Sequence, residues 1–288
     1  MISCGKFFFP ISSTATATAN CYGYCRLPLN TATKKMILND KGIYSGLTEA
    51  KKRGEKRLAI LFDPDKLRLK KMEQTLDLAL SCGVDYFFIG GSLVVNDMLD
   101  ELLAQIRRRC PVPLLLFPGN SFQLSYRADG ILFLSLISGR NPELLIGQHV
   151  ISAPFLKMSP LEIISTGYIL VDGGVQTAVQ YMSNTYPIPA NKDDIAVCTA
   201  MAGELLGLRM IYLDAGSGAR IPVSESMIEA VSGAVSVPLI VGGGIRTPEK
   251  VAVNLRAGAD LVVVGNAIEK DPSLIREISA AVKDFQPV

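Results

Sequence analysis

Eight short runs of apolar, strand-forming residues recur along the chain, and longer segments separate them. The runs are LAILF (58–62), YFFI (86–89), PLLLF (113–117), GILFL (130–134), GYILV (167–171), RMIYL (209–213), PLIV (238–241) and LVVV (261–264). Continuous apolar strands are typical of a parallel sheet whose two faces are both covered by helices. This alternation constrains the fold more than any other feature of the sequence.

Eight strands that alternate with helical segments predict an α/β fold, a TIM-type (βα)8 barrel in which the sheet closes on itself. Residues 65–83 have apolar residues at helical spacing and end on Gly83, and residues 247–258 open with Thr247 and a proline. A doubly wound open sheet has the same alternation and is the structural alternative.

The third crossover of this predicted barrel is too short for an ordinary helix. Only residues 118–129 separate the third and fourth runs, which leaves too little chain for two loops and a helix of roughly 11 residues. We therefore expect a barrel that lacks a full third helix. The uncovered apolar side of such a barrel can admit an elongated hydrophobic ligand.

Composition limits the partners that the chain can bind. The 288 residues carry 29 basic and 27 acidic side chains, so neither a nucleic-acid surface nor a polybasic membrane anchor is expected. The longest apolar stretches, such as 130–138, are shorter than the roughly 18 to 20 residues of a membrane-spanning helix.

His149 is the only histidine, which argues against a Ser-His-Asp hydrolase and favours a structural role for this residue.

The first 35 residues differ from the rest of the chain. They contain no acidic residue, are rich in Ser and Thr, and show no helical or strand periodicity. Residues 1–35 are expected to be an unstructured extension or the product of a start site assigned too far upstream, and 36–288 to form a single phosphate-binding barrel. Cys21 and Cys25 lack a second ligand pair, so we expect reduced thiols in a cytoplasmic protein.

Glycine-rich turns follow the last three strands, and this pattern predicts a phosphate site. The turns read DAGSG (214–218), GGG (242–244) and GN (265–266). Glycines let backbone N–H groups approach an anion, and a helix that begins beyond them adds the positive end of its dipole. One such turn is weak evidence, but three in succession are specific.

Asp63 ends the first strand, and Ser92 follows the glycine pair after the second. A carboxylate beside a hydroxyl suits Mg²⁺, which prefers a few hard oxygen ligands and completes its shell with water and phosphates. The alternative makes Asp63 a turn residue and Ser92 a helix cap. Lys66 is either a phosphate partner or the solvated start of the first helix.

Six motifs occur in an order that resembles the geranylgeranylglyceryl phosphate synthase family and its bacterial heptaprenylglyceryl phosphate relatives. They are ILFDPDK, FFIGGS, GYILVDGG, IYLDAGSGA, VGGGIRTPEK and VVVGNAI, and they cover residues of about 40 to 285. The resemblance implies that a long-chain prenyl diphosphate, geranylgeranyl by the family's name, donates its chain to the C3 hydroxyl of sn-glycerol 1-phosphate. This transfer releases diphosphate and makes an ether phospholipid precursor. The family also implies a homo-oligomer.

The resemblance assigns roles to particular residues. Asp63 and Ser92 would bind Mg²⁺, Asp214 would orient the accepting hydroxyl and take its proton, and Tyr168 would lie near the substrate. The residues implied to bind glycerol phosphate are Tyr212, Leu213, Asp214, Ala215, Gly216, Ser217, Gly218, Gly243, Gly244, Gly265 and Asn266. Lys66 is added to the substrate-binding residues as the phosphate partner that its position after Asp63 suggests. Many family members carry Glu at the position of Asp214, so the carboxylate of this chain is one methylene shorter.

Two other functions fit parts of the pattern. A sugar-phosphate isomerase or cyclase like the histidine-biosynthetic barrels would use aspartates after strands one and five, here Asp63 and Asp172. Such barrels have a phosphate site in each half, whereas the third run here is followed by a single glycine. The second alternative is a non-catalytic barrel that binds a phosphorylated metabolite, against which the presence of Asp63, Ser92 and Asp214 argues.

Overall fold

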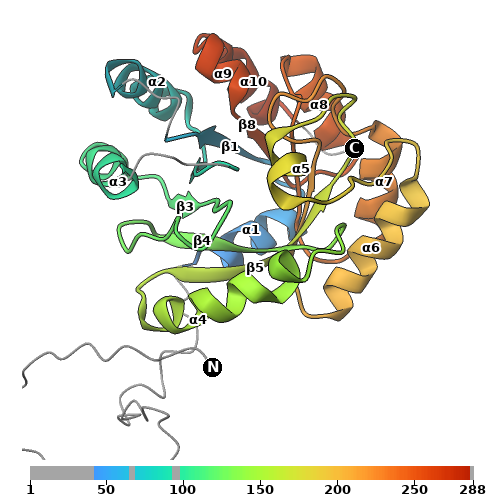
Figure 1. Ribbon diagram of the computed structural model, residues 1–288. Helices are drawn as coiled ribbons and strands as arrows, with labels where there is room; N and C mark the ends of the chain where they lie inside the picture. Colours follow the sequence, from blue (N-terminus) through green and yellow to red (C-terminus); the bar gives the residue numbers. More distant parts are fainter. Residues whose placement is uncertain (1–41, 65–68, 93–97, 286–288) are drawn as a thin grey trace, which may run out of the picture. The chain divides into compact units, whose positions relative to one another are not determined.

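The computed structural model describes residues 42–64, 69–92 and 98–285, and these form a closed barrel of eight parallel strands (Figure 1). The strands are β1 (Arg57–Phe62), β2 (Tyr86–Ile89), β3 (Leu114–Leu116), β4 (Gly130–Leu136), β5 (Glu162–Leu170), β6 (Met210–Asp214), β7 (Leu239–Gly242) and β8 (Leu261–Val264). β1 pairs with both β2 and β8, with Ala59 opposite Tyr86 on one side and Val263 on the other. The closure confirms the barrel and rules out the open sheet.

Helices cover the outside of this barrel. They are α2 (Leu69–Cys82), α3 (Leu99–Arg107), α4 (Gln148–Met158), α6 (Asp193–Leu205), α7 (Glu225–Ala234), α8 (Pro248–Arg256) and α10 (Leu274–Lys283). α8 begins as predicted, because the Thr247 hydroxyl accepts the backbone N–H of Lys250 at 3.3 Å and Pro248 occupies the first turn. Two further helices, α5 (Ala178–Ser183) and α9 (Asn266–Lys270), are short and follow β5 and β8.

The core has two layers, which explains why the strands are apolar on both faces. Alternate side chains of β7 illustrate this: Ile240 points into the barrel, while Leu239 and Val241 pack in the layer between the sheet and the helices. All three are at most 1% exposed. Burial of this kind on every strand is what the eight apolar runs encode.

The third crossover has no helix, as the sequence predicted. Residues 117–129 run from β3 to β4 through turns only, and the next helical segments are η2 (Glu143–Gly147), a π-helical turn, and α4. The hydroxyl of Tyr126 donates to the carbonyl of Phe155 at 3.1 Å, which joins this crossover to the end of α4. α4 therefore packs beside a part of the barrel wall that no third helix covers (Figure 1).

A helix that the sequence did not reveal, α1 (Ile43–Lys52), packs against the amino end of the barrel. Ile43 and Leu47 join the interior core cluster. The buried carboxylate of Glu162, the first residue of β5, accepts the backbone N–H groups of Ile43 and Tyr44, each at 2.9 Å. These bonds satisfy two N–H groups that the first turn of a helix leaves unpaired.

None of the helices in the described ranges has both the length and the apolar character needed to cross a membrane.

Candidate active site

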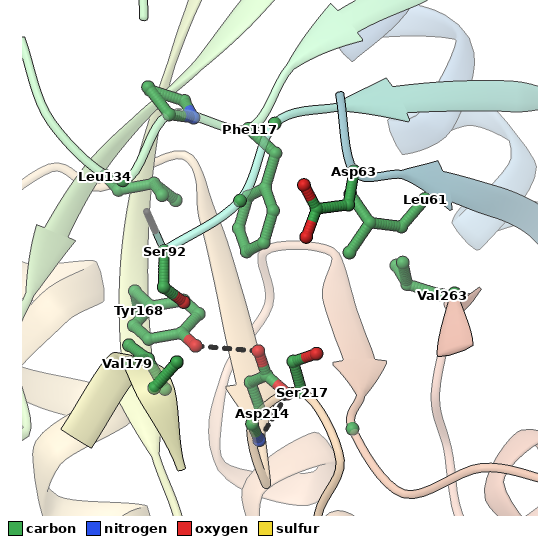
Figure 2. Close-up of a pocket in the computed structure, with 18 of the residues that line it drawn as sticks. Leu61, Asp63, Ser92, Phe117, Leu134, Tyr168, Val179, Asp214, Ser217 and Val263 are labelled. Atoms are coloured by element: carbon green, nitrogen blue, oxygen red, sulfur yellow. Dashed lines mark hydrogen bonds between the residues drawn. The ribbon is translucent and has the colours of Figure 1, made fainter. Parts of the chain in front are cut away.

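A cavity of about 900 Å³ opens at the carboxyl ends of the strands. Figure 2 shows Asp63 beside the ring of Phe117 on one side of it, and Asp214 and Ser217 together on another, with Tyr168 hydrogen-bonded to Asp214. These residues come from the ends of strands or the turns after them. Chemistry in βα barrels collects at this face because the strand ends converge there.

Asp214 and Tyr168 form a buried hydrogen-bonded pair in the cavity wall. The hydroxyl of Tyr168 donates to Oδ2 of Asp214 at 2.6 Å, and the backbone N–H of Gly216 donates to Oδ1 at 2.7 Å. Burial raises the pKa of the Asp214 carboxyl, and the bonds from Tyr168 and then Gly216 oppose that rise. Burial and the neighbouring carboxylate also raise the pKa of Tyr168, so its hydroxyl remains a donor.

Four glycines with positive φ shape the turns after β6 and β7. They are Gly216, Gly218, Gly243 and Gly244, with φ between 69° and 87°. At Gly243 a Cβ atom would collide with Oδ1 of Asp214 and with the backbone nitrogens of the facing turn. Only glycine allows the two turns this close approach. Within the described part of the chain, the backbone N–H groups of Gly243 and Gly244 have no hydrogen-bond acceptor, which leaves them able to bind an anion.

Side-chain hydrogen bonds connect the glycine-rich turns after β6, β7 and β8. The Ser217 hydroxyl, after β6, donates to Oδ1 of Asn266, after β8, at 3.2 Å. Nη2 of Arg246, after β7, donates to the carbonyl of Ala219 at 2.6 Å. The short helix α9 starts at Asn266, a common feature of barrel phosphate sites. The turns are therefore held as one preformed cradle.

Asp63 and Ser92 lie on adjoining turns of the cavity rim. A Cβ atom on Gly91 would lie 3.3 Å from the Asp63 carboxylate, so the turn that carries Ser92 packs directly against that carboxylate. Both residues line the cavity. In the described ranges, no three His, Cys, Asp or Glu side chains gather into a metal site. One carboxylate and one hydroxyl still fit Mg²⁺, because this ion takes few protein ligands when substrate phosphates supply the others.

Three aromatic rings pack together beneath the cavity. The centroid of Phe117 lies 5.4 Å from that of Tyr212 and 6.1 Å from that of Tyr168, and the two tyrosine rings meet edge to face at 5.5 Å. The Tyr212 hydroxyl lies against Gly242, where a Cβ atom would come within 2.5 Å of it. The rings give the cavity a rigid floor with electron-rich faces.

From this floor the cavity continues as an apolar groove along β4. Its lining includes Leu134 and Leu136, which face the barrel interior, and also Ile131 and Phe133, which face outward. A cavity can border both faces of one strand only if it passes around the barrel wall. It does so at the third crossover, so the missing helix creates a groove, as the sequence indicated.

Most of the predicted site residues line this cavity. They are Asp63, Ser92, Tyr168, Tyr212, Asp214, Gly216, Ser217, Gly218, Gly243, Gly244, Gly265 and Asn266. Leu213 and Ala215 are not among the lining residues, because alternation along β6 turns their side chains into the outer core layer, and their part in substrate binding stays a prediction. Lys66 lies outside the described residues, as do Cys21, Cys25 and the extension 1–35.

Sequence reasoning missed several cavity residues. Phe117 is the last residue of the third predicted run, and Arg246 lies within the VGGGIRTPEK motif, so their positions could have identified them. Val179 comes from α5, whose place over the cavity no local pattern shows. His149 is buried as predicted, with Nε2 3.0 Å from the Ser135 hydroxyl, but it also lines the groove. Burial lowers the pKa of His149, so its ring is neutral at pH 7.

Together, the fold and the cavity define a phosphate-binding βα barrel with an added groove for an elongated apolar group. The chain belongs to the PcrB family, which it matches over residues 51–282. Its relatives include geranylgeranylglyceryl phosphate synthases of bacteria and archaea, which confirms the resemblance of the motifs.

The protein of Chitinophaga pinensis with that name is 56% identical over 249 residues, which cover 85% of this chain and 98% of the relative. The protein of Korarchaeum cryptofilum is 37% identical, with 82% and 99% covered. Among solved structures, (S)-3-O-geranylgeranylglyceryl phosphate synthase from Thermoplasma acidophilum in complex with sn-glycerol-1-phosphate is 28% identical. It superimposes with a TM-score of 0.79, covering 84% of this chain and 99% of that one.

Proposed function

We propose that the protein is a prenyltransferase that joins a long-chain prenyl diphosphate, geranylgeranyl diphosphate in the first instance, to the C3 hydroxyl of sn-glycerol 1-phosphate. One observation carries the proposal: a single cavity has a backbone cradle for an anion at one end and an apolar groove at the other. The cradle suits the phosphate of the acceptor, and the groove suits the apolar chain of the donor. Relatives that carry the synthase name support the same conclusion, as does the archaeal structure with bound glycerol phosphate. The product would be an ether phospholipid precursor.

In this proposal Asp214 is the base. Glycerol phosphate sits in the cradle with its C3 hydroxyl toward the Asp214 carboxylate, which Tyr168 holds in place. As the bond between the prenyl C1 and diphosphate breaks, its electron pair leaves with diphosphate and positive charge develops on the allylic carbons. The hydroxyl oxygen bonds to C1, and its proton passes to Asp214. The floor of Phe117, Tyr168 and Tyr212 presents aromatic faces that favour a nearby cation.

Magnesium has a role on the donor side of the proposed site. The Asp63 carboxylate and the Ser92 hydroxyl would hold the ion. Bound there, Mg²⁺ would neutralise charge on the departing diphosphate. The acceptor cradle lies at the turns after β6, β7 and β8, so the two anions would occupy different parts of the cavity rim.

The isomerase alternative loses support from the position of Asp172. Its side chain is exposed, and it accepts the backbone N–H of Gly174 at 2.9 Å in a local turn. Asp172 is not part of the cavity lining, whereas Asp63 is. A mechanism that needs both carboxylates around one substrate therefore does not fit the geometry.

The experiment that tests the proposal is product detection by mass spectrometry after incubation with Mg²⁺, geranylgeranyl diphosphate and sn-glycerol 1-phosphate. We expect a prenylglyceryl phosphate and equimolar diphosphate, and loss of both when EDTA removes the metal. Asp63→Asn should abolish most turnover with little change in glycerol phosphate affinity. Asp172→Asn is the matched control and should remain active. Loss of activity in Asp172→Asn but not in Asp63→Asn would contradict the proposal.

We also propose that the protein is a cytoplasmic homo-oligomer. The outward face of α4 exposes Ile151, Phe155 and Met158, each more than half exposed. Apolar residues that gather on one helix face are typical of a protein interface. Light scattering coupled to size exclusion should give a mass above that of one chain, and a monomer at micromolar concentration would contradict this.

A further inference from the structure

The glycine pair that follows β2 extends beyond the end of the neighbouring strand, β3. β3 is only three residues long and ends at Leu116. The next residue, Phe117, still donates its backbone N–H to the carbonyl of Ile89 in β2 at 2.9 Å. Past this bond the crossover turns away, so the peptide groups of Gly91 need a partner other than a strand.

The side chain of Gln123, in the third crossover, supplies that partner. Its Nε2 donates to the carbonyl of Gly91 at 2.9 Å. Its Oε1 accepts the backbone N–H of Gly91 at 3.4 Å and that of Gly119 at 3.2 Å. One side-chain amide thus takes the place of a peptide group in the missing part of the strand. Such a pairing needs a donor and an acceptor on one group, which only Gln and the shorter Asn offer.

The crossover also packs closely against the glycine pair. A Cβ atom on Gly90 would collide with the carbonyl of Phe117, and a Cβ atom on Gly119 would collide with the carbonyl of Gly91. Gln123 is 5% exposed and, among the residues that the structure describes, is not part of the cavity lining, whereas Gly91 is. Gln123 can therefore act on the cavity only through the turn that it holds.

We infer that Gln123 is a positioning residue for the donor side of the site. Gly91 precedes Ser92 in the chain and packs against the Asp63 carboxylate, which a Cβ atom on Gly91 would approach to 3.3 Å. The amide that fixes Gly91 therefore fixes the placement of Ser92 relative to Asp63. The inference rests on the proposed function, because it takes these two residues to hold the Mg²⁺ of the prenyl diphosphate.

The test measures the affinity for geranylgeranyl thiodiphosphate, a donor that does not react, by calorimetry with and without Mg²⁺. Gln123→Met keeps the length of the side chain but removes all three hydrogen bonds. It should weaken Mg²⁺-dependent donor binding about 10- to 100-fold, the usual effect of removing a group that orients metal ligands. The affinity for sn-glycerol 1-phosphate should stay near that of the wild type, because the cradle is built from the turns after β6, β7 and β8.

A second variant, Gly119→Ala, perturbs the same turn and leaves Gln123 intact. Its Cβ atom would press on the carbonyl of Gly91 from the crossover side. Gly119 is exposed, so the core of the barrel is unaffected. This variant should show the same selective loss of donor binding. If Gln123→Met does not fold, the result for Gly119→Ala decides the question.

Ser125→Ala is the matched control. The Ser125 hydroxyl donates to the carboxylate of Asp100 in α3, so it attaches the same crossover to a different element. Loss of this bond should lower the melting temperature without a selective loss of donor affinity.

Two results would overturn the inference. One is equal weakening of donor and acceptor binding by Gln123→Met, and the other is normal donor binding in both Gln123→Met and Gly119→Ala. Wild-type protein that binds the thiodiphosphate with Mg²⁺ but forms no product from the reactive donor would contradict the proposed function alone. Failure of the wild type to bind the thiodiphosphate would overturn both.

Discussion

The two ends of the barrel are built from the same strands but differ in how they are filled. At the amino end, the space beside α1 shrinks to about 10 Å³, lined by apolar side chains such as Leu47 and Phe88. At the carboxyl end, the cavity measures about 900 Å³. One end satisfies its polar groups internally, as Glu162 does with α1, while the other leaves backbone N–H groups for a ligand. Stability and function are therefore separated along the barrel axis.

The largest effect on activity should come from the carboxyl end. Asp214→Asn keeps the shape of the side chain but removes the base, so turnover should fall by roughly 10² to 10⁴. Glycerol phosphate affinity, measured by calorimetry, should change far less, because the cradle of Gly243 and Gly244 is untouched. Asp194→Asn, on the exposed first turn of α6, is the control. A mild Asp214→Asn phenotype would mean that Asp214 only holds its turn through Gly216.

The amino end should show the opposite behaviour. Glu162→Ala removes the acceptor of two helix N–H groups, which should lower the free energy of unfolding by about 1–3 kcal/mol. Urea unfolding measures this loss, and kcat per folded molecule should stay within about twofold. Glu229→Ala, at an exposed position of α7, is the control and should change neither the free energy of unfolding nor kcat. A Glu162→Ala variant with normal stability but lost activity would break the separation of the two ends.

A smaller effect should appear in the pH profile. Burial raises the pKa of Asp214, and the base must be ionised, so activity should fall as the pH drops through a value above the usual 3.9. The bond from Tyr168 lowers this pKa, so Tyr168→Phe should move the acid limb of kcat/KM to higher pH. Tyr126→Phe, whose hydroxyl bonds to the backbone of α4, is the control. A shift toward lower pH would contradict the role given to Tyr168.

The smallest effect should follow removal of residues 1–35. The first described helix begins at Ile43, and every strand and cavity residue lies beyond it. Thermal melting and turnover of the shortened chain should match those of the full chain. A collapse of the melting temperature would place part of the core in that segment.

The strands were predictable because burial on both faces leaves an unbroken apolar run. β2 and β8 match their predicted limits to the residue. β5 starts five residues before its predicted run, since Ser165 and Thr166 interrupt the apolar pattern inside the strand. α1 was missed because its first turn depends on Glu162, which is 119 residues from Ile43 and cannot be recognised locally.

The cradle was predictable for a different reason. Strand ends converge in any parallel barrel, so glycines and aspartates after strands must meet. The wall of the groove was not predictable from the sequence, because it depends on how α4 packs against β4 and no motif shows that packing. A motif also does not give the direction of each side chain: strand alternation points that of Leu213 into the outer core layer, so its predicted part in substrate binding would fall to its backbone.

A crystal structure with both sn-glycerol 1-phosphate and a non-reactive prenyl thiodiphosphate is the most direct test of the central claim. We expect the glycerol phosphate anion within hydrogen-bond distance of the N–H groups of Gly243 and Gly244, with its C3 hydroxyl at Asp214. The prenyl chain should pass Phe133 toward Leu156. A chain bound elsewhere, or a phosphate held at Asp63 and Ser92 while the glycine cradle stays empty, would contradict the account.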